Sequence, residues 1–223
     1  MQIPENRTIL ERTITAMHLF KLLKRGILPA FFLLFVTSGF SQAYCLLRDP
    51  DREIDAMFPE ADSKKSAVGK IDRAVYDKVT ERLGSFTLYF SELGRHTMYV
   101  PQKGGKALGL VHSRAVESKY GLLEVVWAFD TDLKVKDFSI QRCRSRSSRK
   151  LVTDDFRAQF KGKGFDDLKT MISADAKSLA GGIKAPAGTE ALVVALIKNC
   201  LKTIAVSEEA WAEDLAKIRS ETL

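Results

Sequence analysis

The stretch Gly121–Phe129 (GLLEVVWAF) sets the fold class of this chain, because aliphatic and aromatic residues fill it almost completely. Side chains such as Val and Trp suit the pleated surface of a sheet, so the stretch predicts a β-strand. Asp130, Thr131 and Asp132 follow as a turn, and residues 135–141 have the composition of a second strand. A strand, a short acidic turn and a second strand together predict an antiparallel pair.

Further strands are predicted before this pair. Residues 85–90 alternate between the two faces of a half-buried strand. Residues 96–101 and 106–116 flank Gly104-Gly105, which is a hairpin turn signal. The sequence therefore predicts an antiparallel sheet of four or five strands in a meander.

Helices are predicted on both sides of this sheet along the chain. Asp49 and Pro50 favour a helix start, with the Asp as the cap and the Pro in the first turn, and Pro59 ends that helix. Apolar residues also recur at helical spacing in five further segments, which are 67–83, 156–160, 165–172, 191–204 and 208–219. The predicted fold class is α+β, with two helices, the sheet, and then C-terminal helices.

The N-terminal segment, residues 1–43, has the features of a secretory signal. Lys21, Lys24 and Arg25 precede the apolar run 26–40, and small residues ending at Ala43 follow it. This run is shorter than the ~18–20 residues of a comfortable membrane span, which favours a cleaved signal peptide. An uncleaved membrane anchor helix is the alternative. Both interpretations predict an exported protein, periplasmic in a bacterium, with residues 44–223 as one α+β domain.

Three cysteines follow the predicted cleavage position, namely Cys45, Cys143 and Cys200. An oxidising compartment favours one disulfide and one remaining thiol. Cys143 with Cys200 is the predicted pair, since Cys45 lies at the new N-terminus. The cysteine spacings match no zinc or haem motif, so no metal site is expected.

No catalytic motif is present in the sequence, which lacks the G-x-S-x-G, H-E-x-x-H, C-x-x-C and P-loop patterns. His96 and His112 lie in predicted strands, where a packing role is commoner than catalysis. Neighbouring acidic residues fall in a turn or at helix starts, where anions are favoured without any catalytic role. Whether the protein is an enzyme stays open, and no catalytic residue is assigned.

Residues 142–150 (RCRSRSSRK) concentrate positive charge in one segment. Arg142, Arg144 and Arg146 alternate with Cys and Ser, and guanidinium groups beside hydroxyls suit phosphate oxygens. An acidic partner protein and a solvated loop without a ligand are the alternatives. Nucleic acid is not expected, because the protein is predicted to be exported and no aromatic residue separates the arginines to stack on bases.

A second candidate binding element precedes the apolar helix predicted at 191–204. Ala187, Gly188, Thr189 and Glu190 lead into this helix, and small residues let backbone N–H groups approach a ligand closely. A helix N-terminus also attracts anions. The plain alternative is an N-cap, in which Thr189 caps the helix and Gly188 provides the turn.

The order of these segments resembles a family of flavin mononucleotide (FMN)-binding domains. The family includes the C subunit of sodium-translocating NADH:quinone reductase and the G subunit of the Rnf electron-transport complex. The resemblance covers roughly residues 50–204. It is carried by the Phe-Pro-Glu-Ala phrase at 58–61, the strand–turn–strand unit at 122–141, the Gln-Phe-Lys-Gly-Lys phrase at 159–163 and the small residues at 187–190. It implies FMN as cofactor, a role in electron transfer and a redox partner protein at the membrane.

The resemblance also implies where the flavin phosphate would lie. Relatives carry FMN on the threonine of a Ser-Gly-Ala-Thr motif, and aligning Gly188 with the motif glycine puts Glu190 at the threonine position. A glutamate cannot form that phosphoester. Non-covalent FMN, or a related phosphate ligand, is therefore expected, held by the three arginines and the helix start. The alternative is a cofactor-free module of the same fold that docks an acidic partner or the membrane surface through its basic segment.

Overall fold

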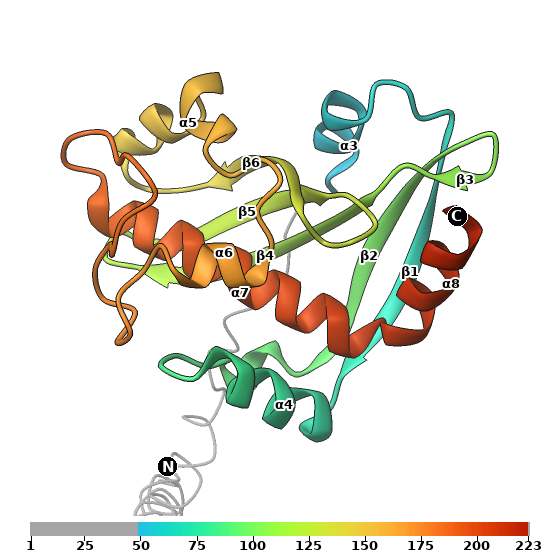
Figure 1. The fold of residues 1–223 in the computed structure, drawn as a ribbon, viewed down its shortest axis with the longest axis horizontal. Coiled ribbons are helices and arrows are strands. Elements are labelled where there is room, and N and C mark those ends of the chain that lie inside the picture. The colour runs from blue at the N-terminus through green and yellow to red at the C-terminus, as the bar shows by residue number, and fades with distance from the viewer. Residues whose placement is uncertain (1–48, 223) are drawn as a thin grey trace, which may run out of the picture. The chain divides into compact units, whose positions relative to one another are not determined.

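The computed structural model describes residues 49–222, which form an antiparallel sheet covered by helices (Figure 1). The predicted signal or anchor segment and Cys45 lie outside the described residues. The strands are β1 (Ser63–Ile71), β2 (Gly94–Lys103), β3 (Lys106–Ala107), β4 (Leu110–Ser118), β5 (Gly121–Phe129) and β6 (Val135–Arg142). The helices are α3 (Asp51–Met57), α4 (Arg73–Leu83), α5 (Asp154–Ala158), α6 (Phe165–Lys169), α7 (Glu190–Ala210) and α8 (Ala212–Thr222), with short 3-10 helices η1 (Phe90–Glu92) and η2 (Arg146–Leu151).

The sheet follows the order β1-β2-β4-β5-β6, with the short β3 paired to β2. Each of its strand pairs is antiparallel, so the prediction of a mixed helix and sheet fold with an antiparallel sheet and C-terminal helices is confirmed. The Gly104-Gly105 turn joins β2 to β3, as expected. The described residues contain six strands, which corrects the predicted four or five.

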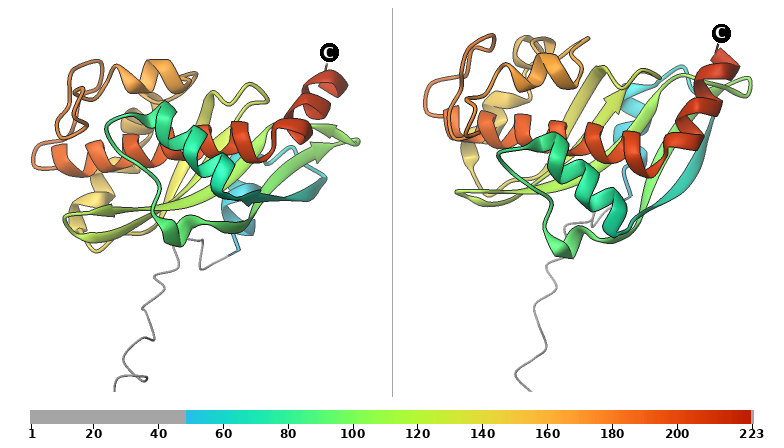
Figure 2. Two further views of the ribbon diagram at one scale, coloured as in Figure 1. Left: turned by 90° about the horizontal axis from the view of Figure 1, so that it is seen from below. Right: turned by 60° about the horizontal axis from the view of Figure 1, so that its bottom comes forward.

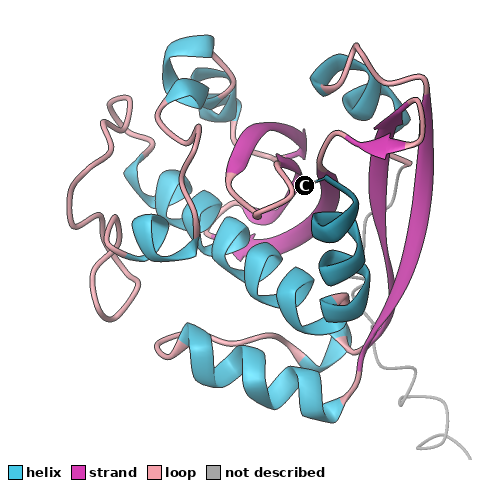
Figure 3. Cartoon of the chain, turned by 45° about the vertical axis from the view of Figure 1, so that its right-hand side comes forward, coloured by secondary structure: helices cyan, strands magenta, loops and turns pink. Residues whose placement is uncertain are grey.

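β5 is buried on both of its faces, which explains its nearly continuous apolar sequence. Its odd-numbered residues from Leu123 to Phe129 belong to the main core beneath α7. Val126 and Ala128 face the other way and pack with Phe58 of the α3 region. Figure 2 shows α4 and α7 lying together on one side of the sheet, and Figure 3 shows the strands twisting behind this helical layer.

α7 is longer than the predicted helix 191–204, because its last turns remain buried against the sheet. Ser207 hydrogen-bonds to Nδ1 of His112 at 2.8 Å. Nearer its middle, the amide oxygen of Asn199 accepts from the indole N–H of Trp127 at 2.7 Å. These contacts carry the helix to Ala210, and α8 therefore begins at Ala212 rather than at the predicted residue 208.

The predicted helix 67–83 is wrong in its first part, where the chain forms β1. Trp211 explains the difference, since its indole N–H donates to the carbonyl of Ala67 at 3.0 Å. Its ring covers Gly69 so closely that an added Cβ would lie 2.5 Å from it. The helix α4 starts afterwards, with the side chain of Asp72 accepting from the N–H of Val75 at 3.1 Å.

The predicted strand 85–90 is also wrong, because the chain there forms a loop followed by η1. The side chain of Glu92 accepts from the N–H of Tyr89 at 2.9 Å and turns the chain into η1. Leu88 points into the core, whereas Phe90 is 66% exposed. The alternation of apolar residues favours a strand here, but the buried Glu92 carboxylate turns the chain into η1 instead.

The predicted strand 106–116 is divided in two at Leu108-Gly109. Gly109 has a φ of 158° and passes so close to β5 that a Cβ would lie 2.2 Å from the carbonyl oxygen of Phe129. Hydrogen bonding continues on the far side of this break, where β4 pairs with β5 along its whole length.

Two predicted caps are made differently in the structure. The N-cap of α3 is Pro50, without a side-chain hydrogen bond, and Asp49 instead interacts with Asp51, which raises the pKa of Asp49. Thr189 occupies the N-cap position of α7, but its hydroxyl donates to the carbonyl of Pro186 at 2.6 Å. Helix α5 has the predicted length of five residues but begins two residues earlier, at Asp154, whereas α6 ends at Lys169 and is shorter than the predicted segment.

The predicted Cys143–Cys200 disulfide is wrong, since both residues are free thiols. Cys200 lies in the middle of α7 within the core, and Cys143 lies just past the end of β6. Burial raises the pKa of the Cys200 thiol well above its usual range, which keeps it protonated and unreactive.

Gly69→Ala should destabilise the protein by about 1–3 kcal/mol, because the new methyl group would overlap the Trp211 ring. Urea unfolding checks this, with Ser66→Ala, an exposed position on the same strand, as the control. Equal free energies of unfolding for the two variants would show that packing of Trp211 on Gly69 does not stabilise this strand.

Candidate functional site

The segment before α7 is held in place by the Gln159 side chain. Its amide oxygen accepts from the N–H of Lys184 at 2.7 Å, and its amide nitrogen donates to the carbonyl of the same residue at 3.2 Å. Phe160 beside it is fully buried in the core, which fixes the position of Gln159. The phrase that carries part of the family resemblance therefore positions the loop that leads into the helix.

The basic segment 142–150 closes onto this loop. Lys150 donates from Nζ to the carbonyl of Ala187 at 3.1 Å. The next residue, Leu151, is fully buried and anchors η2, while the Ser145 hydroxyl accepts from the N–H of Ser147 at the start of η2. The two predicted binding elements thus lie side by side.

The three predicted arginines do not act as one group. Arg142 extends towards Glu124, with 3.4 Å between Nη1 and Oε1. Glu124 precedes Val125 on β5 and follows Leu123, both of which face α7, so this ion pair lies on the opposite face of the sheet. Arg142 is therefore not part of the site near Gly188, which corrects its predicted place.

Arg144 and Arg146 are both exposed, and they differ in position. The side-chain stem of Arg144 passes within 4 Å of the place that a Cβ on Gly121 would occupy, at the start of β5. Arg146 is the first residue of η2. Arg144 is thus held beside the turn that carries Lys119.

Glu190 indicates where negative charge is stabilised at this end of α7. Its carboxylate accepts from the N–H of Gly188 at 3.2 Å. Backbone hydrogen bonds from its own N–H and from Gly188 lower the pKa of Glu190, and the charges of Lys119 and Lys150 lower it further. A first-turn acidic residue also complements the helix dipole. Ala187, Gly188, Thr189 and Glu190 therefore form the entrance to α7, with a carboxylate already at the helix N-terminus.

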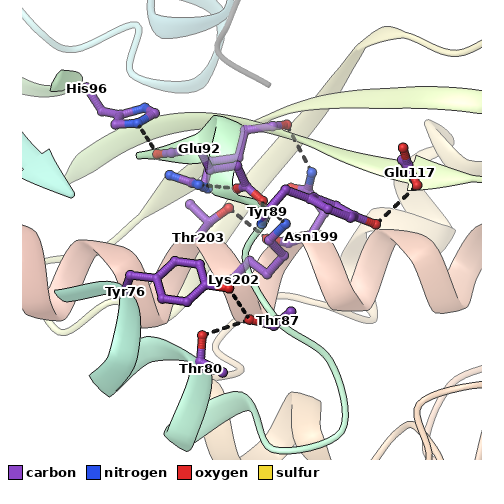
Figure 4. A network of polar contacts seen from close by, with 11 residues as sticks. Tyr76, Thr80, Thr87, Tyr89, Glu92, His96, Glu117, Asn199, Lys202 and Thr203 are labelled. Atoms are coloured by element: carbon purple, nitrogen blue, oxygen red, sulfur yellow. Dashed lines mark hydrogen bonds and ion pairs between the residues drawn. The ribbon is translucent and has the colours of Figure 1, made fainter. Parts of the chain in front are cut away.

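A second polar cluster lies in the interior and was not predicted. Glu92 forms ion pairs with Arg114 of β4 and with Lys202 of α7, and all three side chains are almost completely buried. Figure 4 shows Glu92 and Lys202 within the surrounding network of polar contacts. Asn199 supports this cluster by donating to the backbone carbonyl of Arg114 at 2.9 Å. The ammonium group of Lys202 also lies 4.9 Å from the ring centre of Tyr89. One carboxylate therefore connects η1, β4 and α7.

The pKa values in this cluster follow from burial and from neighbouring charge. Burial raises the pKa of Glu92, but Arg114 and Lys202 outweigh it and the net pKa is lowered. Burial lowers the pKa of Lys202 to about 8, against the opposing effect of Glu92. Burial and the charge of Arg114 lower the pKa of His96 and, more strongly, of His112. Both imidazoles are neutral at pH 7.

A sequence signal for this cluster did exist. Asn199 and Lys202 are polar residues in a mostly apolar helix, at a spacing that puts them on one face. A polar side chain on a buried helix needs a buried partner. What the sequence does not indicate is the identity of the partners, since Glu92 lies 110 residues from Lys202.

Comparison with known proteins does not assign the chain to a family, since no protein-family model and no curated protein matches it. Among residues 49–222, no helix has the length and apolar character needed to cross a membrane. Within the same residues, His, Cys, Asp and Glu side chains form no group of three or more that could hold a metal ion. Function must therefore be inferred from the geometry of the site.

Glu92→Gln should lower the free energy of unfolding by about 3–5 kcal/mol, because it leaves two buried cations without a carboxylate. Glu117→Gln is the matched control, since Glu117 is an exposed glutamate that accepts from the hydroxyl of Tyr89. It should change stability by less than about 0.5 kcal/mol. Similar losses for the two variants in denaturant unfolding would contradict a structural role for the cluster.

The free energy of unfolding of the wild type should rise relative to that of Lys202→Met as the pH increases from about 8 to about 10. Lys202 releases its proton near pH 8 when folded but keeps it up to 10.5 when unfolded, so the unfolded state binds more protons in this interval. The gain is at most about 3 kcal/mol. Denaturant titrations of both proteins in sodium gluconate measure it, and a difference that stays constant with pH would contradict the lowered pKa.

Proposed function

We propose that the exported domain binds FMN, or a related phosphate ligand, non-covalently at the N-terminus of α7 and serves an electron-transfer system with a redox partner protein at the membrane. The observation that carries this proposal is the hydrogen bond from Lys150 to the carbonyl of Ala187 at 3.1 Å. It joins the basic segment to the helix start, so cationic side chains and backbone N–H groups face one place. The family resemblance of the sequence supplies the choice of ligand.

The residues at this place suit a phosphate group. Gly188 presents its N–H to an acidic oxygen, and the positive end of a 21-residue helix lies behind it. Lys119, Lys150 and Arg144 would add charge-assisted hydrogen bonds. Glu190 is exposed, so its side chain can turn into solvent when a phosphate takes the Gly188 N–H. FMN would supply the electron chemistry, while these residues bind and orient its phosphate.

The alternative is a cofactor-free module of the same fold that docks an acidic partner or the membrane surface. One observation favours it, namely that the Glu190 carboxylate itself satisfies the Gly188 N–H. An internal carboxylate in that position repels a second anion. In this alternative, the exposed Arg144, Arg146 and Arg149 would make the contacts.

Glu190→Gln should tighten FMN binding about tenfold, since it removes one like charge from the site. Lys150→Ala should weaken binding by a similar factor, and Lys217→Ala, an exposed lysine on α8, should leave it unchanged. Quenching of flavin fluorescence in a titration of the purified protein measures all three.

The visible spectrum of the purified protein, recorded before and after acid precipitation, separates the two candidate functions. Flavin released by acid supports non-covalent binding, whereas flavin that stays with the protein would refute the alignment at Glu190. If the protein is colourless and binds no added FMN, either as wild type or as Glu190→Gln, FMN binding is refuted and the cofactor-free module becomes the supported function.

A further inference from the structure

The interior cluster around Glu92 carries an excess of positive charge. Arg114 and Lys202 each pair with Glu92, and the side chains of the three residues are at most 1% exposed. Among residues 49–222, Glu92 is the one carboxylate that pairs with either cation. One negative and two positive groups leave a net charge of about +1 in a region of low dielectric constant, where an uncompensated charge costs several kcal/mol.

Arg114 also has unused hydrogen-bond donors. Its Nη2 donates to Glu92, but Nε and Nη1 are buried and have no acceptor among the described residues. An arginine cannot lose its proton in a protein, so both N–H groups remain charged donors. Buried donors of this kind are almost always satisfied by protein, by ordered water or by an ion.

The groups around Arg114 leave few ways to balance this charge. The titratable groups on the surrounding elements include Tyr89 and Glu92 of the η1 region, His96 of β2, His112 of β4, and Lys198 and Lys202 of α7. Glu117 of β4 is a further carboxylate, but it is exposed and accepts from the hydroxyl of Tyr89, so it lies outside the buried cluster. The two histidines are already neutral at pH 7. Either Lys202 gives up its proton, or a negative ion joins the cluster. A water molecule could satisfy the two donors, but it would leave the excess charge in place.

We propose that Arg114 holds a small monovalent anion of about the size of chloride, bound to its Nε and Nη1 groups in the interior beneath α7. The anion completes a cluster of two cations and two anions that links η1, β4 and α7. Its binding stabilises the folded state, because the unfolded chain offers no such group of charges. This site is separate from the helix N-terminus of α7 and does not depend on the proposed flavin function.

Chloride should therefore raise the thermal unfolding midpoint of the full protein. The measurement varies sodium chloride against sodium gluconate at constant ionic strength and pH 7, and the midpoint should rise by a few degrees as chloride passes from about 10 to about 500 mM. In Lys202→Met, which removes the excess charge, the chloride effect should disappear. Lys198→Met, one turn earlier on α7 and partly exposed, is the matched control and should keep it.

Crystals soaked in sodium bromide test the site directly and need no variant. An anomalous bromide peak within hydrogen-bond distance of Arg114 Nε or Nη1 is the expected result. A water without anomalous signal at that place would overturn the proposal. So would an equal chloride effect in Lys202→Met, which would assign the effect to the surface. The proposal would also be overturned if the free energy of unfolding of the wild type rose above pH 8 by the same amount in chloride and in gluconate. That result would mean that Lys202 removes the excess positive charge by losing its proton.

Discussion

The carboxylate of Glu92, placed between two buried cations, is the constraint on which the rest of the structure depends. Moving charges out of water is unfavourable unless they meet in good geometry, so η1, β4 and α7 must come together at this point or not at all. The two partners lie 22 and 110 residues away in the chain. This requirement turns the segment before β2 into η1 and leaves Phe90 exposed at the surface.

α7 connects two different electrostatic environments. Its C-terminal half is buried and contributes Lys202 and Ser207 to polar contacts with the sheet. Its first residue, Glu190, lies at the surface, where Gly188 and nearby lysines stabilise a negative group. A single long helix therefore serves as the structural centre of the domain and as the backbone of the candidate ligand site.

The parts of the fold that local chemistry controls could be predicted. β5 and β6 follow from apolar composition and the acidic turn between them, and the β2–β3 hairpin follows from Gly104-Gly105. The closeness of the basic segment to the helix start was also expected, but through the arginines, whereas in the structure Lys150 makes the contact with Ala187. Arg142 could not be placed correctly, because the face on which it lies is set by its register opposite Glu124 in β5. The interior charge cluster was not predicted, because its members come from three separate elements that are brought together only in the folded chain.

The sequence by itself determined that the chain forms an antiparallel sheet with an apolar C-terminal helix, because alternation, turn residues and helical spacing act over a few neighbouring residues. The tertiary structure alone decided the conformation of residues 67–71, where spacing favours a helix but Trp211, 144 residues beyond Ala67, seals an extended strand. It alone also decided which charges are buried together. Packing against distant residues contributes more free energy than local preference, and that contribution exists only once the chain has folded.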